Sequence, residues 1–483
     1  MSDIAKHWIA GEWTGSENVS ESMNPATGAI LGRWADGGEA EARAAIAAAR
    51  RAFDTSVWSR DRGLRNQVLT ELAERFDAHA KELGTLVTKE NGKRLAEGLF
   101  EAGSPSPTLR HNAGQALTDT GIAAEVAPGQ WYTTYAEPAG VVGIIVPWNA
   151  PVALLMRSLG PALAAGNTVA VKMPGQTALV ANLVSQIIAE VGSLPSGVVN
   201  IFSESGNAGA PFLVASPDVQ VISYTGSSPV GRIIAASGAP TLKRMNLELG
   251  GKTPMVVFDD ADLDSVVPLL AAGITTFSGQ FCMTGSRVLA QRGVADEVRS
   301  RLSDILEHVR VGDGLDPATD MGPLIDKANV ARVDGVVEAA LAYAKPIVRG
   351  GPATEGALSA GSFYRPTLLE VDDVNSDIVQ REVFGPVATF EVFDTEADAI
   401  WRANAGEMGL AAGVFTNDLN ISSRVSRGLQ AGTVWTNTWA AINDGFAEGG
   451  YKQSGVGRLR GPLAISDFQE AKTVVHSIPP YHG

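Results

Sequence analysis

The sequence is poor in the residues that build disulfides and metal sites. Its 483 residues include one cysteine, Cys282, and six histidines that lie far apart. A single cysteine excludes an intramolecular disulfide framework and every zinc site that needs two thiolates. Because no two histidines stand at a spacing typical of metal ligation, we expect no bound metal ion.

Targeting segments and long apolar runs are also missing. The N-terminus lacks a basic region followed by an apolar one, so we expect no secretory signal. The most apolar stretch, residues 151–171, contains Arg157, Pro161, Gly166 and Asn167 and should not span a bilayer. With 38 basic and 53 acidic residues the formal charge is −15, which repels phosphate backbones and anionic membranes. We expect a soluble, cytoplasmic protein that binds neither nucleic acid nor membranes.

The sequence does contain an alternating order of strands and helices. Strands are predicted over 141–147, 168–173, 198–202 and 219–226, with helices between them over 151–165, 177–191 and 208–215. Short apolar strands separated by helices indicate βαβ units and a parallel sheet covered on both faces, which is typical of a nucleotide-binding domain. A second α/β section follows Gly250 and Gly251. Two further β-leaning segments, 131–138 and 473–480, have no covering helix, and we expect non-local pairing for them, with another subunit as a candidate partner.

A strand-to-helix turn at 224–229 has the composition of a phosphate site. Gly226 and Ser227 follow a predicted strand, and Ser228 is expected to cap a helix that begins at Pro229. Free backbone N–H groups at such a turn bind phosphate, although most turns of this kind are plain connections. The segment 251–253, Gly-Lys-Thr, is not a P-loop, because position 246 is asparagine where that motif needs glycine.

Two residues could carry chemistry. A lone cysteine is usually a buried structural residue, but Cys282 stands among the small and polar residues of 279–285, which favours an accessible nucleophile. Glu248 lies between Leu247 and Leu249. It could point to solvent from a strand, or it could be buried with a raised pKa and act as a general base. Spacing alone does not choose between these readings.

Motifs along nearly the whole chain resemble those of the NAD(P)-dependent, non-phosphorylating, hydrolytic aldehyde dehydrogenase superfamily. In chain order they are HWIAGEW (7–13), ENGK (90–93), VPWN (146–149), Lys172 after a strand, SYTGSSPVG (223–231), LELGGK (247–252), GQFCMTGSR (279–287), MGPLIDK (321–327), EVFGPV (382–387), GTVWTN (432–437) and GYKQSGVGR (450–458). The resemblance implies oxidation of an aldehyde to the carboxylate with NAD or NADP. It gives the roles of catalytic residues to Cys282, Asn149 and Glu248.

In this reading the Cys282 thiolate attacks the aldehyde, giving a thiohemiacetal and, after hydride transfer, a thioester. Asn149 and the backbone N–H of Cys282 are expected to form the oxyanion hole. Glu248 is expected to activate the water that hydrolyses the thioester. The alternatives from other classes are a non-catalytic binding or structural relative, and a CoA-acylating aldehyde dehydrogenase, which typically lacks the glutamate.

The resemblance also implies a set of coenzyme contacts. They are Trp148, Gly226 and Ser227 near the pyrophosphate, Lys172 and Gly175 at the adenosine ribose, and Glu382 and Phe384 around the nicotinamide ribose and ring. Position 175 departs from the pattern, because relatives usually carry a glutamate there that binds the ribose hydroxyls. Without that carboxylate a 2′-phosphate would meet Lys172 and no repulsion, so we expect NADP to be accepted as well as NAD.

Substrate contacts are expected from Arg157, Phe281 and Met283. Arg157 could clamp a substrate carboxylate or pair with Glu448, which replaces an aromatic residue of the family. The substrate is therefore expected to be an aromatic aldehyde, a medium-chain aldehyde or an acidic one, that is, a semialdehyde. Leu459 stands where some relatives carry a glutamate that passes protons from the general base, so that relay is expected to be absent or different.

The fold implied by the resemblance is α/β with three parts. A Rossmann-like coenzyme domain comprises 1–119 and 140–250, a catalytic α/β domain comprises 251–460, and a small β bridging element comprises 120–139 and 461–483. In relatives that element pairs across subunits, so a homodimer or homotetramer is expected.

Overall fold

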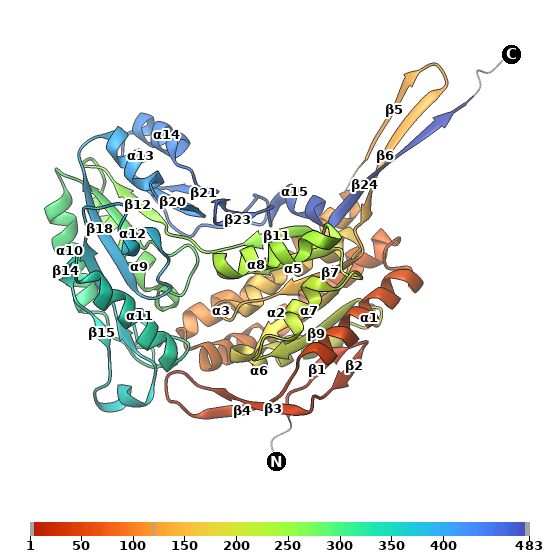
Figure 1. Ribbon diagram of the computed structural model, residues 1–483, viewed down its shortest axis with the longest axis horizontal. Helices are drawn as coiled ribbons and strands as arrows, with labels where there is room; N and C mark the ends of the chain where they lie inside the picture. Colours follow the sequence, from red (N-terminus) through yellow and green to blue (C-terminus); the bar gives the residue numbers. More distant parts are fainter. Residues whose placement is uncertain (1–3, 119–120, 479–483) are drawn as a thin grey trace.

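A computed structural model describes residues 4–118 and 121–478, which form two α/β lobes and a projecting arm (Figure 1). Residues of the first half of the chain build one lobe, and residues 254–436 build the second. No helix in the described ranges is both long enough and apolar enough to cross a membrane.

The sheet of the first lobe has five parallel strands at its centre. They are β7 (Val141–Ile145), β8 (Thr168–Pro174), β9 (Val199–Glu204), β10 (Val221–Thr225) and β11 (Arg244–Glu248). Their order across the sheet is β9-β8-β7-β10-β11, which in chain order reads 3-2-1-4-5 and is the Rossmann arrangement. The order reverses between β7 and β10, and ligands of such sheets bind beyond the carboxyl ends of the strands at that reversal.

Antiparallel strands extend this sheet at both edges. They are β1 (His7–Ile9) and β2 (Glu12–Thr14) beside β9, and β23 (Gly455–Val456) beside β11. A separate hairpin of β3 (Asn18–Met23) and β4 (Ile30–Asp36) runs along the base of the molecule in Figure 1.

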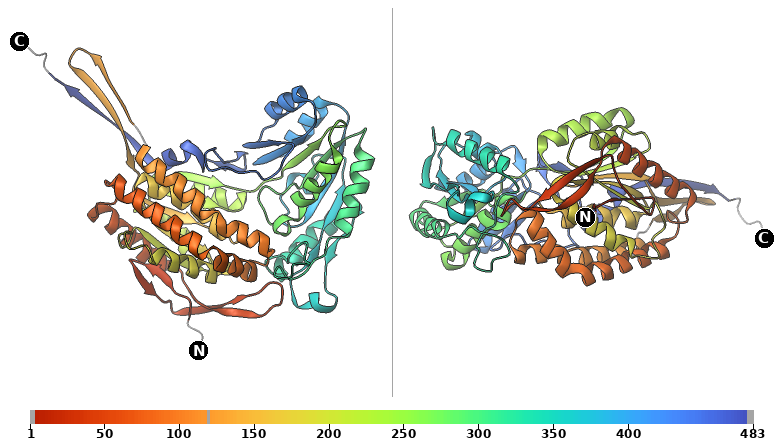
Figure 2. Two further views of the ribbon diagram at one scale, coloured as in Figure 1. Left: turned by 180° about the vertical axis from the view of Figure 1, so that it is seen from behind. Right: turned by 90° about the horizontal axis from the view of Figure 1, so that it is seen from below.

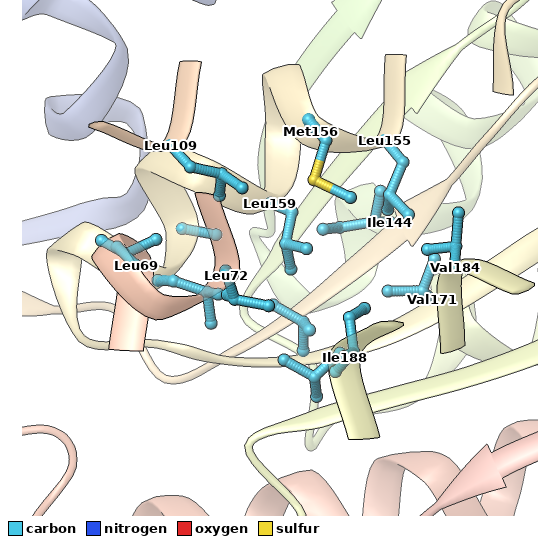
Figure 3. Packing of buried hydrophobic residues seen from close by; sticks show 14 of the residues in the cluster. Leu69, Leu72, Leu109, Ile144, Leu155, Met156, Leu159, Val171, Val184 and Ile188 are labelled. Atoms are coloured by element: carbon cyan, nitrogen blue, oxygen red, sulfur yellow. The ribbon is translucent and has the colours of Figure 1, made fainter. Parts of the chain in front are cut away.

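Helices cover both faces of the first sheet because its central strands are apolar on both sides. The helices are α1 (Glu39–Thr55), α2 (Arg62–Asn91), α3 (Leu95–Gly103), α4 (Pro105–Thr118), α5 (Pro151–Ala165), α6 (Ala178–Ala189), α7 (Gly209–Ala215) and α8 (Ser228–Gly238). On one face Leu69, Leu109 and Leu159 pack against Ile144 and Val171 (Figure 3). On the other face α1, α7 and α8 contribute a second apolar cluster.

The second lobe repeats the layered plan around a seven-stranded sheet. Its order is β14-β17-β18-β13-β12-β20-β21, with β14 (Lys345–Val348), β17 (Thr367–Glu370), β18 (Val387–Phe393), β13 (Arg287–Gln291), β12 (Pro254–Val257), β20 (Ala411–Phe415) and β21 (Thr433–Thr436). All neighbours are parallel except β14 and β17. The helices are α9 (Leu263–Thr275), α10 (Ala295–Glu307), α11 (Lys327–Ala340), α12 (Asp377–Gln380), α13 (Glu396–Asn404) and α14 (Leu419–Gly428). Short pairs join β15 (Gly351–Pro352) to β16 (Tyr364–Arg365) and β19 (Met408–Gly409) to β22 (Tyr451–Lys452).

The arm is an antiparallel sheet in the order β24-β6-β5, built from β5 (Ile122–Ala127), β6 (Gln130–Pro138) and β24 (Gln469–Ser477). It extends away from both lobes (Figure 2). The two segments without a covering helix thus pair with each other within one chain, as far as they lie in the described residues, and their outer apolar side chains, such as Trp131 and Val475, remain exposed.

The boundary expected at residue 461 differs from the observed packing. The short helix α15 (Gly461–Ala464) and the turn after it lie on the first lobe, where Ile465 and Phe468 belong to the same apolar core as α5. The bridging sheet therefore takes only β24 from this part of the chain. The reason is that Ile465 and Phe468 find an apolar face to bury against, whereas β24 does not.

Candidate active site

The predicted catalytic residues meet at the carboxyl edge of the first sheet. Strand β7 leads into the segment that ends at Asn149, and β11 ends on Glu248. The loop that carries Cys282 reaches this edge from α9 of the second lobe, and the side-chain amide of Asn149 donates to the carbonyl of Gln280 at 3.0 Å. Three distant parts of the sequence therefore converge between the two lobes.

The loop before Cys282 has an unusual backbone. Phe277, Ser278 and Gly279 all have positive φ, at 52°, 56° and 69°. Non-glycine residues hold this conformation only where their surroundings enforce it, and such strain clusters at functional sites. The Ser278 hydroxyl donates to the carbonyl of Gly322 at 2.8 Å, and a Cβ on Gly279 would lie 2.2 Å from Gly385. Close packing against two other segments thus fixes the path of the loop.

Cys282 sits in a tight turn whose shape is set by its neighbours. The Thr284 hydroxyl donates to the carbonyl of Phe281 at 2.6 Å, and a Cβ on Gly251 would lie 2.2 Å from the Cys282 carbonyl. Within the described residues no backbone carbonyl accepts the N–H of Cys282, which leaves that donor for a ligand. Burial raises the thiol pKa to about 12, so the thiol is protonated at neutral pH.

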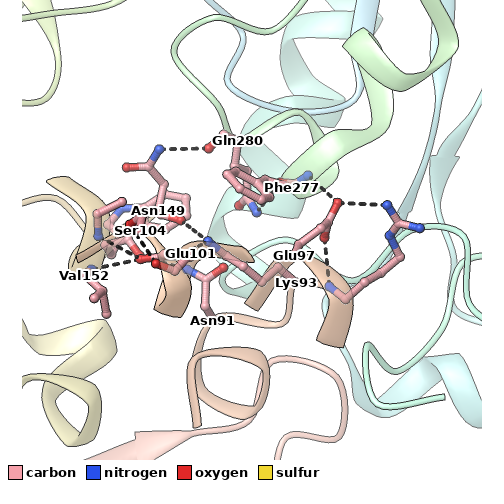
Figure 4. A network of polar contacts seen from close by, with 12 residues as sticks. Asn91, Lys93, Glu97, Glu101, Ser104, Asn149, Val152, Phe277 and Gln280 are labelled. Atoms are coloured by element: carbon pink, nitrogen blue, oxygen red, sulfur yellow. Dashed lines mark hydrogen bonds and ion pairs between the residues drawn. The ribbon is translucent and has the colours of Figure 1, made fainter. Parts of the chain in front are cut away.

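The segment that ends at Asn149 is held from below by the ENGK motif (Figure 4). Asn91 donates to the carbonyl of Trp148 at 2.8 Å, and the Lys93 ammonium donates to the carbonyl of Asn149 at 2.7 Å. Glu101, which pairs with Lys93 at 2.6 Å, also accepts the backbone N–H of Val152 at the start of α5. The amide of Asn149 is therefore oriented before any substrate binds.

The same ammonium reaches the cysteine loop. Lys93 Nζ lies 4.0 Å from the ring centroid of Phe277, and Glu97 accepts the backbone N–H of Phe277 at 3.1 Å. The sequence analysis identified ENGK only as a motif and missed these roles. The available signal was a lysine with acids four and eight residues later, at Glu97 and Glu101, where helical spacing places both acids on one face.

We expect replacement of Lys93 by methionine to destabilise the fold by about 3–5 kcal/mol, because Glu101 keeps its buried charge without a partner. Replacing both residues, as Lys93→Met with Glu101→Met, should recover most of that loss. Urea unfolding of the single and double variants measures both free energies. Equal destabilisation of the two variants would show that the charge pair is not the source of the effect.

Glu248 is buried at the end of β11, with 3% of its surface exposed. One carboxylate oxygen lies 3.6 Å from the Arg157 guanidinium, and the other has no hydrogen-bond partner among the described residues. Burial raises its pKa to about 7, with Arg157 acting in the opposite direction. Of the two readings left open by the sequence, the structure shows the buried one.

Arg157 pairs with Glu448 rather than standing free. The two side chains form a direct hydrogen-bonded ion pair, and Arg157 also donates to the Thr225 hydroxyl at 3.0 Å. Both side chains of the pair are buried. Glu448 accepts a second hydrogen bond from Arg460 Nε at 2.8 Å. The alternative in which Arg157 has an internal partner is therefore the arrangement observed.

Aromatic rings form a wall beside the cysteine. Phe281 packs edge-on against Phe277 and Trp439, with ring centroids 5.6 and 5.9 Å apart. Met283, by contrast, is 1% exposed and packs with Leu410 and Trp435. The turn at Cys282 directs the Met283 side chain into the core of the second lobe, so the predicted contact between Met283 and the substrate is not seen in this structure.

The predicted strand-to-helix turn is present at the end of β10, but the helix that follows begins one residue earlier than expected. Helix α8 begins at Ser228, so Ser227 is its N-cap, one residue earlier than expected. The Ser228 hydroxyl instead donates to the carbonyl of Gln453 at 3.1 Å. A Cβ on Gly226 would lie 2.1 Å from the Tyr224 hydroxyl, so a larger residue here would require the Tyr224 side chain to move. The first turn of α8 carries no acid, and its N–H groups suit a phosphate.

Opposite this turn lies the segment with Glu382 and Phe384. The Phe384 ring packs edge-on against Trp148 at 5.6 Å, and its φ of 54° is again strained. Arg332 donates to the carbonyls of Val383 and Phe384 at 2.7 and 3.2 Å, a clamp that the sequence analysis missed because the two elements are far apart in the chain. Glu382 accepts the N–H of Gly251 at 3.2 Å, and burial raises its pKa to about 7.

The Lys172 ammonium lies within the electrostatic reach of two carboxylates. Asp36 and Glu204 both act to raise its pKa, against a larger lowering by burial. A Cβ on Gly175 would lie 2.9 Å from the ring of Trp34, so no longer side chain fits there. The indole N–H of Trp34 is buried and has no partner among the described residues. Position 175 itself carries no acid, and the expectation that a 2′-phosphate meets Lys172 without repulsion stays a prediction, against which the charges of Asp36 and Glu204 have to be set.

Together the Rossmann sheet, the phosphate-type turn at its reversal point and the thiol beside a buried acid define a dinucleotide-dependent oxidoreductase class. Comparison with known proteins is more specific. The model of the aldehyde dehydrogenase family matches residues 13–474. The chain belongs to the aldehyde dehydrogenase family.

Relatives of several substrate specificities are about equally similar. Retinal dehydrogenase 2 of Mus musculus is 36% identical over 98% of this chain and 92% of its own. The mitochondrial succinate-semialdehyde dehydrogenase of Arabidopsis thaliana is 37% identical over 96% of this chain and 88% of its own. A structure of betaine aldehyde dehydrogenase from Staphylococcus aureus in complex with NAD+ superposes with a TM-score of 0.96 at 33% identity, covering 99% of this chain and 96% of that one. These likenesses establish the family and leave the substrate open.

Proposed function

We propose that the chain oxidises an aldehyde to its carboxylate with a nicotinamide coenzyme, through an acyl group held on Cys282. The convergence of Cys282, Asn149 and Glu248 at one sheet edge carries this proposal. The thiol adds to the carbonyl carbon while its proton passes to Glu248, whose pKa of about 7 leaves it able to accept one. The side-chain amide of Asn149 and the N–H of Cys282 hold the oxygen that becomes negative.

A nicotinamide coenzyme, when bound, accepts the hydride from the former aldehyde carbon, and the carbonyl re-forms as a thioester on sulfur. Glu248, once it has passed the thiol proton to solvent, takes a proton from the water molecule that attacks the thioester. The C–S bond breaks, the carboxylate leaves, and the sulfur recovers its proton. The single carboxylate thus acts as base in both halves of the reaction.

The residues present fit such a coenzyme. Gly226, Ser227 and the first turn of α8 would hold the pyrophosphate, with Trp148 beside them. Lys172 would meet the adenosine ribose, and the Trp34 ring, which lies against Gly175, carries an indole N–H that has no partner among the described residues. Glu382 and Phe384 would bound the nicotinamide ribose and ring.

We expect both coenzymes to be used, with kcat/KM for NAD higher than for NADP by about tenfold, a difference of roughly 1.4 kcal/mol. Asp36 and Glu204 repel a 2′-phosphate, while Lys172 attracts it. Replacing Asp36 by asparagine should reduce the ratio of kcat/KM for NAD to kcat/KM for NADP. Steady-state rates with each coenzyme measure it, and a preference for NADP in the unmodified protein would contradict the assigned role of the two acids.

The proposed substrate class is an uncharged aromatic or medium-chain aldehyde. The Arg157 guanidinium is already paired with Glu448. The wall beside the thiol consists of the aromatic rings of Phe277, Phe281 and Trp439. A substrate carboxylate would meet aromatic rings there, and to reach Arg157 it would have to displace Glu448.

We therefore expect benzaldehyde and hexanal to be oxidised with kcat/KM at least about tenfold above succinic semialdehyde, because an unpaired buried charge is strongly disfavoured. Initial rates of coenzyme reduction with the three aldehydes test this. A preference for succinic semialdehyde that disappears in Arg157→Ala would overturn the substrate class and restore the carboxylate clamp. No turnover with any aldehyde and either coenzyme would instead support a binding or structural role.

The arm supports a further part of the proposal, that the chain is a homodimer or homotetramer. Its long strands expose apolar side chains such as Ile122, Val126 and Val475, which a monomer would leave in water. Light scattering of the purified chain gives the mass in solution, and a monomer would refute this assembly.

A further inference from the structure

The Arg157 guanidinium lies between two buried carboxylates and contacts them unequally. It donates a hydrogen bond to Glu448, whereas Glu248 lies at 3.6 Å without a hydrogen bond. The remaining oxygen of Glu248 has no partner among the described residues. An arginine beside one carboxylate would normally form a bidentate pair with it. Here Arg157 makes a single hydrogen bond to Glu448 instead, and Glu248 is left without one.

Glu448 is itself held from the opposite side. Arg460 donates to its second oxygen at 2.8 Å and also pairs with Asp444, which accepts the hydroxyl of Thr108 at 3.0 Å. The backbone of Glu448 exchanges hydrogen bonds with Leu459, at 2.6 and 2.8 Å. The charges alternate in sign from Glu248 through Arg157, Glu448 and Arg460 to Asp444. Such an anchored carboxylate can fix the position of the guanidinium.

We propose that Glu448 is a positioning residue that keeps Arg157 from forming a full ion pair with Glu248, so that Glu248 remains free to accept protons. The proposal rests on the proposed function, in which Glu248 is the general base. It gives a role to a buried acid that takes no part in the steps of the proposed reaction.

The direction of the effect follows from charge. The groups that face Glu248 are Arg157 from α5, Glu448 and Arg458 from the segment after β21, and the Cys282 thiol. Glu448 raises the pKa of Glu248, whereas Arg157 lowers it. Without the charge of Glu448, Arg157 would pair more closely with Glu248 and lower its pKa. Glu248 would then be a weaker base that is deprotonated at lower pH. Without Arg157, Glu248 would hold its proton to higher pH.

The test is the pH dependence of deacylation. The acyl-enzyme is formed from benzaldehyde and NAD in a single turnover, and its decay is followed by intact mass after acid quenching at intervals. In the unmodified protein the rate should rise through about pH 7. We expect Glu448→Gln to move this midpoint down by about one unit or more and to lower the rate at high pH. Arg157→Gln should move it up. Arg460→Gln, which removes the anchor of Glu448, should move it down in the same direction as Glu448→Gln.

Glu391→Gln is the matched control, because Glu391 forms an equally buried pair with Arg287 in the second lobe. It should reduce stability without moving the midpoint. The positioning role is overturned if Glu448→Gln, like Glu391→Gln, does not change the midpoint of the pH dependence. It is also overturned if Glu448→Gln moves that midpoint in the same direction as Arg157→Gln. Should Glu448→Gln fail to fold, Arg460→Gln still decides, since an unmoved midpoint there contradicts the proposal.

A result that refutes the proposed function can be distinguished from one that refutes only the positioning role of Glu448. If deacylation persists at the normal rate in Glu248→Gln, then Glu248 is not the base. The proposed function is then refuted, and with it the role of Glu448 that depends on it. If Glu248→Gln blocks deacylation while the Glu448 and Arg460 variants keep the normal midpoint, only the positioning role falls.

Discussion

Replacing Cys282 by alanine is expected to lower aldehyde oxidation by at least about 10⁴-fold, the range found when a covalent nucleophile is removed. The change removes the atom that captures the aldehyde and leaves the coenzyme contacts untouched. Since Cys282 is the only cysteine, no other thiol can replace it. The measurement is the initial rate of coenzyme reduction with benzaldehyde at saturating NAD.

The control for this variant is coenzyme binding. Quenching of tryptophan fluorescence should give the same dissociation constant for NAD with and without the thiol, because the coenzyme segments around Trp148 and Lys172 lie on other parts of the chain. A variant that still oxidises benzaldehyde within tenfold of the normal rate would show that Cys282 is not the nucleophile.

Replacing Glu248 by glutamine should separate the two halves of the reaction. Glutamine keeps the shape of the side chain but cannot accept a proton, so hydrolysis of the thioester should fall by about 10²–10⁴-fold. The first turnover needs a base only for the thiol, and water can supply that slowly over many seconds. We expect a burst of reduced coenzyme close to one equivalent per site, followed by a nearly flat phase.

Stopped-flow absorbance of the reduced coenzyme distinguishes these phases. Glu391→Gln again serves as the buried glutamate outside the site and should show steady turnover. A Glu248→Gln protein with neither burst nor steady phase would place the main role of Glu248 in activating the thiol. Unchanged steady turnover in Glu248→Gln would show that Glu248 takes no part in the mechanism.

Much of the first lobe could be predicted from the sequence. The strands expected at 141–147, 168–173, 198–202 and 219–226 correspond to β7, β8, β9 and β10. Parallel strands buried on both faces are continuous apolar runs, and the helices between them begin and end at proline and glycine signals. The structure supplied what local patterns do not contain, namely the strand order and the reversal between β7 and β10.

The site was only partly predictable. The family motifs pointed to Cys282, Glu248 and Asn149, and the structure brings them to one edge. Spacing could not decide between a free Arg157 and one paired with Glu448, because these residues are 291 positions apart and meet only in the folded chain. Lys93 reaches Asn149 from 56 positions away for the same reason.

Two local expectations differ from the structure for a common physical cause. Ser228 was expected at the cap of α8, but its hydroxyl bonds to Gln453 from a distant loop, and Ser227 takes the cap position. Met283 was expected beside the substrate because it follows Cys282. The turn held by Thr284 directs it inward instead. Contacts across the fold overrode what neighbouring residues indicated.

The central claim is that the aldehyde is oxidised while bound to the sulfur of Cys282. The most direct test is intact-protein mass spectrometry of Glu248→Gln after one turnover with benzaldehyde and NAD, followed by peptide mapping. The account predicts a gain equal to the mass of benzaldehyde less two hydrogen atoms, on the peptide that contains Cys282. An unmodified protein that has nonetheless produced an equivalent of reduced coenzyme would contradict it.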